Sequence, residues 1–135
     1  MEREFSIFTQ AFNFRVSVKQ IIMHELKVAR DLAVIVLEVA SREKLSSVTA
    51  VNITFGKMIQ IVPDIFDFAF RECIRGTLAA DASLNIEVLS VKTKCLECLE
   101  EFVPEGFYFR CMKCGSENLE IIQGKEIFVK SIEGE

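Results

Sequence analysis

The chain has 135 residues, a net charge of −4, and hydrophobic side chains at half of its positions. This length fits one domain, or one domain with a small module, and the hydrophobic content excludes wholesale disorder. Phosphate binding is excluded by the lack of any basic run, and a membrane span by the lack of an apolar segment of roughly 20 residues. The charged first residues do not form a signal peptide, so we expect a soluble cytoplasmic protein.

The first 50 residues contain two hydrophobic patterns of different period. Apolar residues alternate at Phe12, Phe14, Val16 and Val18, which predicts a strand. From His24 the period becomes helical and predicts an amphipathic helix of about five turns. The apolar stripe of this helix consists of Leu26, Ala29, Leu32, Ala33, Val36, Leu37 and Ala40.

A second helix and three further strands follow. Pro63 and Asp64 are typical of a helix start, and Gly76 of a helix end. The apolar side of this helix would hold Phe66, Ala69, Phe70 and Cys73, and we interpret Cys73 as a small buried hydrophobe. Alternating residues predict strands at Val51, Ile53 and Phe55, ending near Gly56, then at Leu84, Ile86 and Val88, and last at Ile127 and Val129.

Four of the five cysteines form two pairs, Cys95-x-x-Cys98 and Cys111-x-x-Cys114, with 12 residues between the pairs. Two residues between thiolates let one tight turn present both sulfurs to the same ion, and two facing turns complete a tetrahedron that suits Zn²⁺. Gly115 would help the chain turn beneath the metal. An iron–sulfur site and a redox dithiol are the alternatives. Two symmetric turns favour a single ion, and neither pair lies at a helix start as a redox pair would.

The cysteine module, residues 93–124, leaves one predicted strand and returns into another. It is therefore an insertion, and we predict an α+β fold with two helices on a small, mixed, three-stranded sheet and an inserted four-cysteine zinc-ribbon module. The module holds three basic and six acidic residues, and a Zn²⁺ ion bound by four thiolates would bring its net charge to −5. Such a surface repels phosphates, so a nucleic-acid partner is excluded.

His24 is the one histidine of the chain. A lone histidine at a helix start is usually a surface or capping residue. No catalytic triad, phosphate loop or nucleophile motif can be assembled around it, so we expect no enzyme.

Four segments together resemble the HypA family of hydrogenase and urease nickel-insertion metallochaperones. They are Met23-His24-Glu25-Leu26 at the start of a helix, "VNITFGKMIQIVPDIFDFAF", "CLEC" with "CMKCGS", and "IIQGKEIFVKSIE". The resemblance implies that His24 binds Ni²⁺, with the amine of Met23 and main-chain nitrogens of His24 and Glu25 as further donors, a nitrogen-rich set that suits this ion. It also implies structural zinc in the module, and as partners a GTPase of the HypB family and the large subunit of [NiFe]-hydrogenase.

The resemblance divides the chain into a nickel-binding domain, residues 23–92 plus 125–135, and the zinc-ribbon module, residues 93–124. Residues 1–22 form an N-terminal extension. Family members begin at the Met-His-Glu motif, so we hypothesise that Met23 is the physiological first residue. The rival hypothesis is a real extension that adds an edge strand. The alternative function is a zinc-ribbon adaptor for protein interactions without a nickel role.

Overall fold

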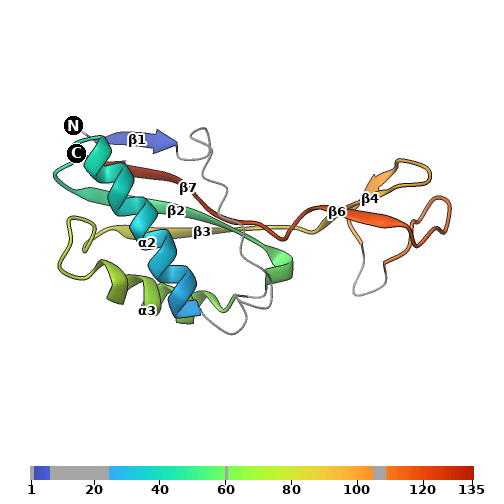
Figure 1. The fold of residues 1–135 in the computed structure, drawn as a ribbon, viewed down its shortest axis with the longest axis horizontal. Helices are drawn as coiled ribbons and strands as arrows, with labels where there is room; N and C mark the ends of the chain where they lie inside the picture. Colours follow the sequence, from blue (N-terminus) through green and yellow to red (C-terminus); the bar gives the residue numbers. More distant parts are fainter. Residues whose placement is uncertain (1, 7–24, 60, 105–108) are drawn as a thin grey trace.

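The computed structural model describes residues 2–6, 25–59, 61–104 and 109–135. The strand predicted around Phe14 lies outside these residues, as do Met23 and His24. The described residues form two helices and two sheets, and the sheets follow one another along the long axis of the molecule (Figure 1). No helix among them is long and apolar enough to cross a bilayer.

Helix α2, Glu25–Arg42, has the predicted length of five turns. Its buried residues are Val28, Ala29, Leu32, Ala33, Ile35, Val36, Val39 and Ala40. Leu26, placed on the apolar stripe by the sequence pattern, is 51% exposed, so that assignment was wrong. The buried face also includes Val28 and Ile35, which lie on the side of the predicted stripe away from Leu26. The buried face is therefore rotated away from Leu26 around the helix axis.

Helix α3, Pro63–Ile74, begins and ends as predicted, with proline in its first turn and Gly76 at a φ of +77° just after it. Its buried side chains include Phe66 and Phe70, and the ring of Phe66 meets that of Phe55 edge to face with 4.8 Å between the centroids. Cys73 is only half-buried against this core, and burial raises the pKa of its thiol.

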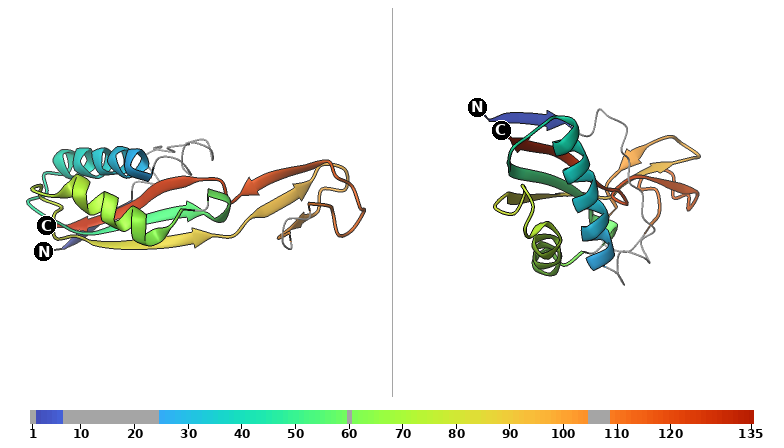
Figure 2. Two further views of the ribbon diagram at one scale, coloured as in Figure 1. Left: turned by 90° about the horizontal axis from the view of Figure 1, so that it is seen from below. Right: turned by 60° about the vertical axis from the view of Figure 1, so that its left-hand side comes forward.

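The main sheet has the strand order β1-β7-β2-β3. Its strands are β1, Arg3–Ser6; β2, Val48–Gly56; β3, Ser83–Leu89; and β7, Ile127–Gly134. β2 pairs in parallel with β3 and antiparallel with β7, and β1 pairs antiparallel with β7. The α+β class and the mixed sheet are confirmed, but β1 makes the sheet four-stranded. Both helices cover the same face of the sheet, and the core lies between them and the strands (Figure 2).

A smaller antiparallel sheet of order β5-β4-β6 projects from the end of the main sheet (Figures 1 and 2). Its strands are β4, Lys92–Cys95; β5, Glu101–Phe102; and β6, Leu119–Gln123. The chain passes from β3 into β4 and returns from β6 into β7. These three strands were not predicted, because they are short and lack a clear apolar alternation.

The junction between the sheets depends on two glycines. A Cβ atom on Gly56 would lie 2.1 Å from the carbonyl carbon of Gly124, and Gly124 itself has a φ of +112°. The short 3₁₀ helix η2, Lys57–Ile59, follows β2 at this point, and the Met58 N–H donates to the Gly124 carbonyl at 2.9 Å. Because larger residues would collide with backbone here, the glycines hold the two connecting segments tightly against the end of β2.

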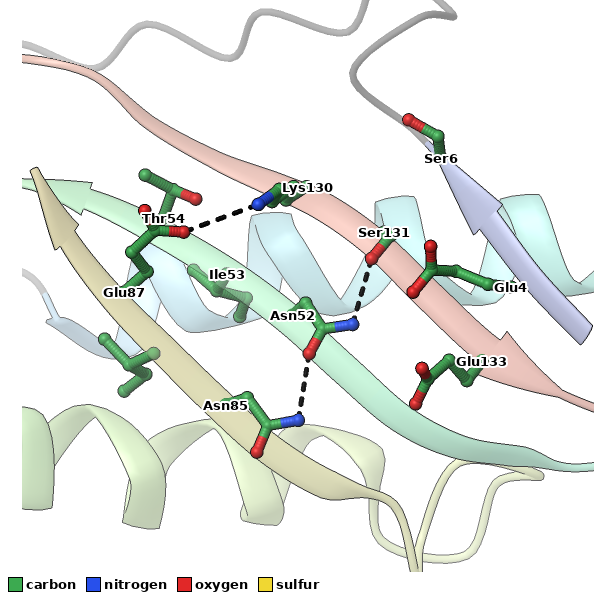
Figure 3. Close-up of a pocket in the computed structure, with 11 residues that line it drawn as sticks. Glu4, Ser6, Asn52, Ile53, Thr54, Asn85, Glu87, Lys130, Ser131 and Glu133 are labelled. Carbon is green, nitrogen blue, oxygen red and sulfur yellow. Dashed lines mark hydrogen bonds and ion pairs between the residues drawn. The ribbon is translucent and has the colours of Figure 1, made fainter.

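The face of the main sheet opposite the helices is polar (Figure 3). Asn85 donates to Asn52 and Asn52 donates to Ser131, each at 2.9 Å, so one row of hydrogen bonds crosses three strands. This row borders a cavity of about 380 Å³. The polar groups satisfy one another, as expected of a sheet face in contact with water.

Candidate metal centre

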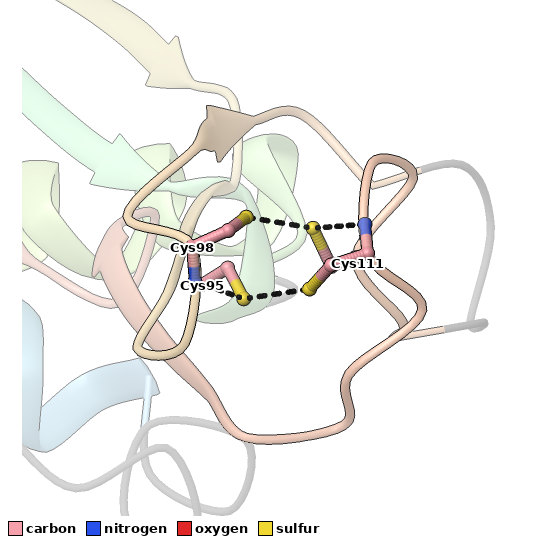
Figure 4. Close-up of side chains that lie close together, drawn as sticks. Cys95, Cys98 and Cys111 are labelled. Carbon is pink, nitrogen blue, oxygen red and sulfur yellow. Dashed lines mark hydrogen bonds between the residues drawn. The ribbon is translucent and has the colours of Figure 1, made fainter.

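The four paired cysteines lie together at the far end of the smaller sheet. Their sulfur atoms are all within 4.8 Å of one another, and Figure 4 shows sulfurs of the two turns facing each other. The Sγ atoms of Cys95 and Cys114 are 3.6 Å apart, and those of Cys98 and Cys111 are 3.5 Å apart. The grouping predicted from the cysteine spacing is therefore confirmed.

The first turn begins where β4 ends. The N–H of Cys95 donates to the carbonyl of Glu100, and the N–H of Leu99 donates to the carbonyl of Cys95, both at 2.9 Å. Inside this loop the N–H of Cys98 points at the sulfur of Cys95 from 3.5 Å. The backbone thus closes on itself and holds both sulfurs on the inner side of the turn.

The second turn repeats this pattern before β6. The N–H of Cys111 donates to the carbonyl of Ser116, and the N–H of Gly115 donates to the carbonyl of Cys111, both at 2.9 Å. The N–H groups of Lys113 and Cys114 each lie 3.4 Å from the sulfur of Cys111. The two turns are therefore equivalent in backbone, as two halves of one tetrahedral site should be.

The equivalence extends to the residue after each pair. Gly115 has a φ of +76°, as expected for a glycine that lets the chain turn. Leu99, at the same place in the first turn, has a φ of +66°, a left-handed conformation that side chains with a Cβ adopt at a cost. Aligning the two cysteine pairs in the sequence places Leu99 opposite Gly115 and would have indicated this strain. A leucine by itself does not predict a positive φ.

The thiols do not share one tendency to ionise. The N–H of Cys114 has the largest effect on the pKa of Cys111 and lowers it. Desolvation acts in the opposite direction, but with the N–H of Lys113 also lowering it, this pKa falls to about 6. At Cys114 the N–H of Ser116 also lowers the pKa, but the neighbouring sulfur of Cys95 and desolvation raise it to about 12. One thiolate therefore forms readily near neutral pH and discourages its neighbours from ionising, so a cation is needed to hold four of them together.

The sulfur positions fit a single metal ion. A tetrahedron of thiolates around Zn²⁺, at a bond length of about 2.3 Å, places the sulfurs about 3.8 Å from one another. The Sγ separations of 3.5 and 3.6 Å between the two turns are close to that value. Cys95 and Cys111 are buried, Cys98 is half-buried and Cys114 is exposed, so the ion would sit near the surface but behind two covered ligands.

The second turn also supports the first through Asn118, a residue that the sequence did not single out. The Asn118 carbonyl accepts from the N–H of Leu96 at 2.9 Å, and its side-chain amide donates to Glu97 at 3.1 Å. These bonds tie the two turns to each other beside the sulfur cluster. An asparagine without a ligand spacing gives no sequence signal for such a role.

Of the three residues predicted to bind nickel, Glu25 is the one that the structure describes. Met23 and His24 lie outside the described residues. Glu25 is the first residue of α2 and is half-buried. It is not part of the metal-ligating group found among the described residues, which consists of the four cysteines.

The chain matches a known protein family over most of its length. Residues 23–134 match the HypA family, described as "Hydrogenase/urease nickel incorporation, metallochaperone". The chain is similar to the "Hydrogenase maturation factor HypA" of Aquifex aeolicus, with 34% identity over 82% of this chain and 96% of that protein. It is similar to the protein of the same name from Moorella thermoacetica, with 35% identity over 84% of this chain and all of that one.

Two solved structures share the fold. One is the solution structure of the Ni metallochaperone HypA from Helicobacter pylori, with a TM-score of 0.63 and 28% identity over 82% of this chain and 96% of that one. The other is a solution structure of a HypA protein, with a TM-score of 0.69 and 28% identity over 84% of this chain and 97% of that one.

Proposed function

The chain belongs to the HypA family, and from this membership we propose that it is a nickel metallochaperone that delivers Ni²⁺ during the maturation of [NiFe]-hydrogenase or urease. The observation that carries the proposal is the family match over residues 23–134, which spans both the helix-covered sheet and the cysteine centre. The nickel ion is cargo in this function, whereas the metal of the cysteine centre stays in place.

We assign Zn²⁺ to the cysteine centre. The tetrahedral sulfur set suits zinc or iron, and the site supplies four ligands around one point rather than around a cluster. Four thiolates leave no open coordination position, which is the pattern of a structural site. The ion would neutralise half of the charge of the four thiolates and hold the two turns together.

We assign nickel binding to His24, with Met23 and Glu25 as associated residues. The support is the family match, which begins at residue 23, and the position of Glu25 as the first residue of α2. An imidazole and main-chain nitrogens at the start of a helix provide the nitrogen donors that Ni²⁺ favours. In this assignment residues 23–92 plus 125–135 form the nickel-binding domain and residues 93–124 the zinc-ribbon module, with residues 1–22 as an extension.

The proposed partners are proteins of the same maturation route in the cytoplasm: a GTPase of the HypB family and the hydrogenase large subunit. Nucleotide hydrolysis would then belong to the GTPase, and we assign no catalysis to this chain. We propose no nucleic-acid or membrane partner, because the residues around the cysteines carry a net negative charge.

The test is a titration of the full chain with Ni²⁺, in parallel with His24→Ala and Glu38→Ala. Glu38 is exposed on α2 and serves as a control for the loss of a polar side chain from the same helix. His24→Ala should lose the tight nickel site and keep one bound Zn²⁺ per chain, while Glu38→Ala should keep both. Equal nickel binding by all three proteins would reject the nickel role and favour the zinc-ribbon adaptor.

The start of the chain is tested separately. A free amine at Met23 would add a donor to the nickel site, so a chain that begins at Met23 should bind Ni²⁺ more tightly than the full chain. The intact mass of the natively expressed protein shows which form exists. A mass that includes residues 1–22 would reject the hypothesis that Met23 is the physiological start.

A further inference from the structure

β1 shows that the outer edge of β7 accepts a further strand. The other side of β7 pairs with β2, so without β1 this strand is an edge of the main sheet. β1 pairs with it antiparallel over four residues, from Arg3 opposite Gly134 to Ser6 opposite Ser131. In a chain that begins at Met23, β1 is absent and the backbone groups of this edge are open to another strand. The edge of β7 can therefore take a strand from elsewhere.

One side chain of β1 fits this edge well. Phe5 lies opposite Ile132 and packs against the core, and the guanidinium group of Arg3 lies over its ring, 5.2 Å from the centroid. A large apolar side chain at this position therefore extends the core beyond β7. Extended peptides that add a strand to a sheet edge bind in the same way, with affinity from the backbone ladder and specificity from alternate side chains.

The neighbouring side chain of β1 does not fit. Glu4 lies directly opposite Glu133, and both side chains lie on the polar face of the sheet (Figure 3). Desolvation, and after it the negative charges of Glu4 and Glu2, raises the pKa of Glu133. Like charges directly opposite each other weaken the pairing of two strands. A strand with a basic side chain in place of Glu4 would complement this edge better than β1 does.

We propose that the outer edge of β7 binds an extended segment of a partner protein, in which a basic residue opposite Glu133 precedes an aromatic or large aliphatic residue opposite Ile132. The segment runs antiparallel to β7 and adds a strand to the main sheet. Its apolar side chain takes the place of Phe5 against the core, and its basic side chain takes the place of Glu4 on the polar face.

The pattern of this segment distinguishes a partner from the other possible occupants. β7 of a second copy lacks the pattern, because its one basic residue, Lys130, is followed by Ser131. β1 carries the apolar residue but the wrong charge, so in a chain that retains residues 1–22 it competes with the partner for the same edge. The inference does not depend on the nickel role, because it uses no residue assigned to either metal.

The test uses two synthetic peptides and the chain that begins at Met23. The 23 buried core residues of the described chain lie between Val28 and Ile132, so this shorter chain keeps the core of the main sheet. One peptide has the sequence of residues 1–8, and the other carries Glu4→Lys. From typical cross-strand pair energies, the Glu4→Lys peptide should bind about two- to thirtyfold more tightly. NMR titration measures both dissociation constants, and the largest shifts should occur at the amides of residues 131–134.

Variants of the protein separate this contact from general charge attraction. Glu133→Lys should reverse the preference, so that the unmodified peptide binds more tightly than the Glu4→Lys peptide. Glu120→Lys makes the same change in net charge at an exposed residue of β6 and should keep the original preference. A Glu4→Lys peptide that also carries Phe5→Ser should lose most of its affinity, because it no longer extends the core.

The full chain provides the last comparison. It should bind the Glu4→Lys peptide more weakly than the shorter chain, because β1 is present at a high effective concentration. Phe5→Asp in the full chain should restore binding by removing the contact of β1 with the core. The proposal is overturned if neither peptide shifts the amides of residues 131–134, or if Glu133→Lys leaves the preference unchanged. It is also overturned if the peptide binds only by splitting a dimer, which would assign this edge to a second copy.

Discussion

The two sheets of this molecule are stabilised in different ways. The main sheet and its helices enclose a continuous apolar core, which holds 23 buried residues in the described part of the chain, among them Phe66, Phe70 and Leu32. In the smaller sheet and its loops, the buried residues among those described between Lys92 and Gln123 are two cysteines and one threonine, Cys95, Cys111 and Thr93. Several apolar side chains of this region are exposed instead, including Leu96, Leu99 and Met112.

This difference shows what each region needs in order to fold. A segment of about 30 residues cannot bury enough surface to be stable, and this one hardly buries any apolar surface. Its hydrogen-bonded turns enclose sulfurs rather than methyl groups. Metal binding must therefore supply most of its folding free energy, whereas apolar burial supplies that of the main sheet.

The largest expected effect comes from removing one sulfur. Cys111→Ala should abolish tight binding of the structural metal and unfold the smaller sheet, because the metal contributes on the order of 10–16 kcal/mol in comparable peptides. The main sheet should stay folded, since its core holds no metal ligand. Metal analysis and NMR measure both outcomes, with Cys73→Ala as the control that keeps the metal. Loss of dispersed signals from the core of the main sheet would contradict this separation.

The second expected effect is the pH dependence of metal binding. The pKa of Cys111 is lowered to about 6, so its thiolate is present above that pH without metal. Backbone N–H groups lower the pKa values of Cys98 and Cys114. Desolvation and the neighbouring sulfurs together have a larger effect in the opposite direction, so both pKa values are raised. Metal must therefore displace at least their two protons at pH 7, and affinity should fall at least about a hundredfold per pH unit.

This dependence should steepen as the pH falls through about 6, because the proton of Cys111 must then be displaced as well. Competition with a chelator of known affinity, repeated from pH 7.5 to pH 5, measures the slope. The stability of the main sheet in the same samples should change far less. A slope that stays constant across pH 6 would show that Cys111 does not ionise ahead of the other thiols.

The third effect tests the other region. Phe66 is fully buried and contacts Phe55 and Phe70, with ring centroids 4.8 and 5.8 Å away. Phe66→Ala should lower the free energy of unfolding of the main sheet by about 3–5 kcal/mol through lost burial and the cavity left behind. Urea denaturation measures this loss. Phe68→Ala, on the exposed side of the same helix, should cost far less, and bound zinc should be unchanged in both native proteins.

Sequence periodicity predicted the main sheet better than the smaller one for the same physical reason. α2, α3, β2 and β3 bury apolar side chains at regular spacing, and that spacing is visible in the sequence. The rival hypothesis allowed an edge strand in the extension, but the position of β1 was not predicted, because its four residues include two charged ones and its partner β7 lies more than 120 residues away. Such a strand is defined by the edge that it covers rather than by its own pattern.

The cysteine centre was predicted from spacing, because two thiolates three residues apart can meet one ion in few ways. The N–H groups that point at the sulfurs could not be predicted, since every residue carries such a group and only the fold aims it. Asn118 was missed for the same reason. The nickel assignment to His24 stays a prediction that comes from family membership, and nickel titration is its test.

The smallest expected effect concerns the one difference between the two cysteine turns. Leu99 holds a φ of +66° where the equivalent Gly115 holds +76°, and Leu99 is 64% exposed, so its side chain adds little packing. Leu99→Gly should relieve about 1 kcal/mol of backbone strain and tighten zinc binding about fivefold, because folding of the turn and binding of the ion are coupled. Leu99→Ala removes the same side chain but keeps a Cβ atom, so it should bring no gain.

In Gly115→Ala a new Cβ would meet no atom within 4 Å, so the expected loss of affinity reports backbone conformation alone. If Leu99→Ala tightened binding as much as Leu99→Gly, the leucine side chain rather than its backbone conformation would be the source of strain, and the two turns would differ in packing instead.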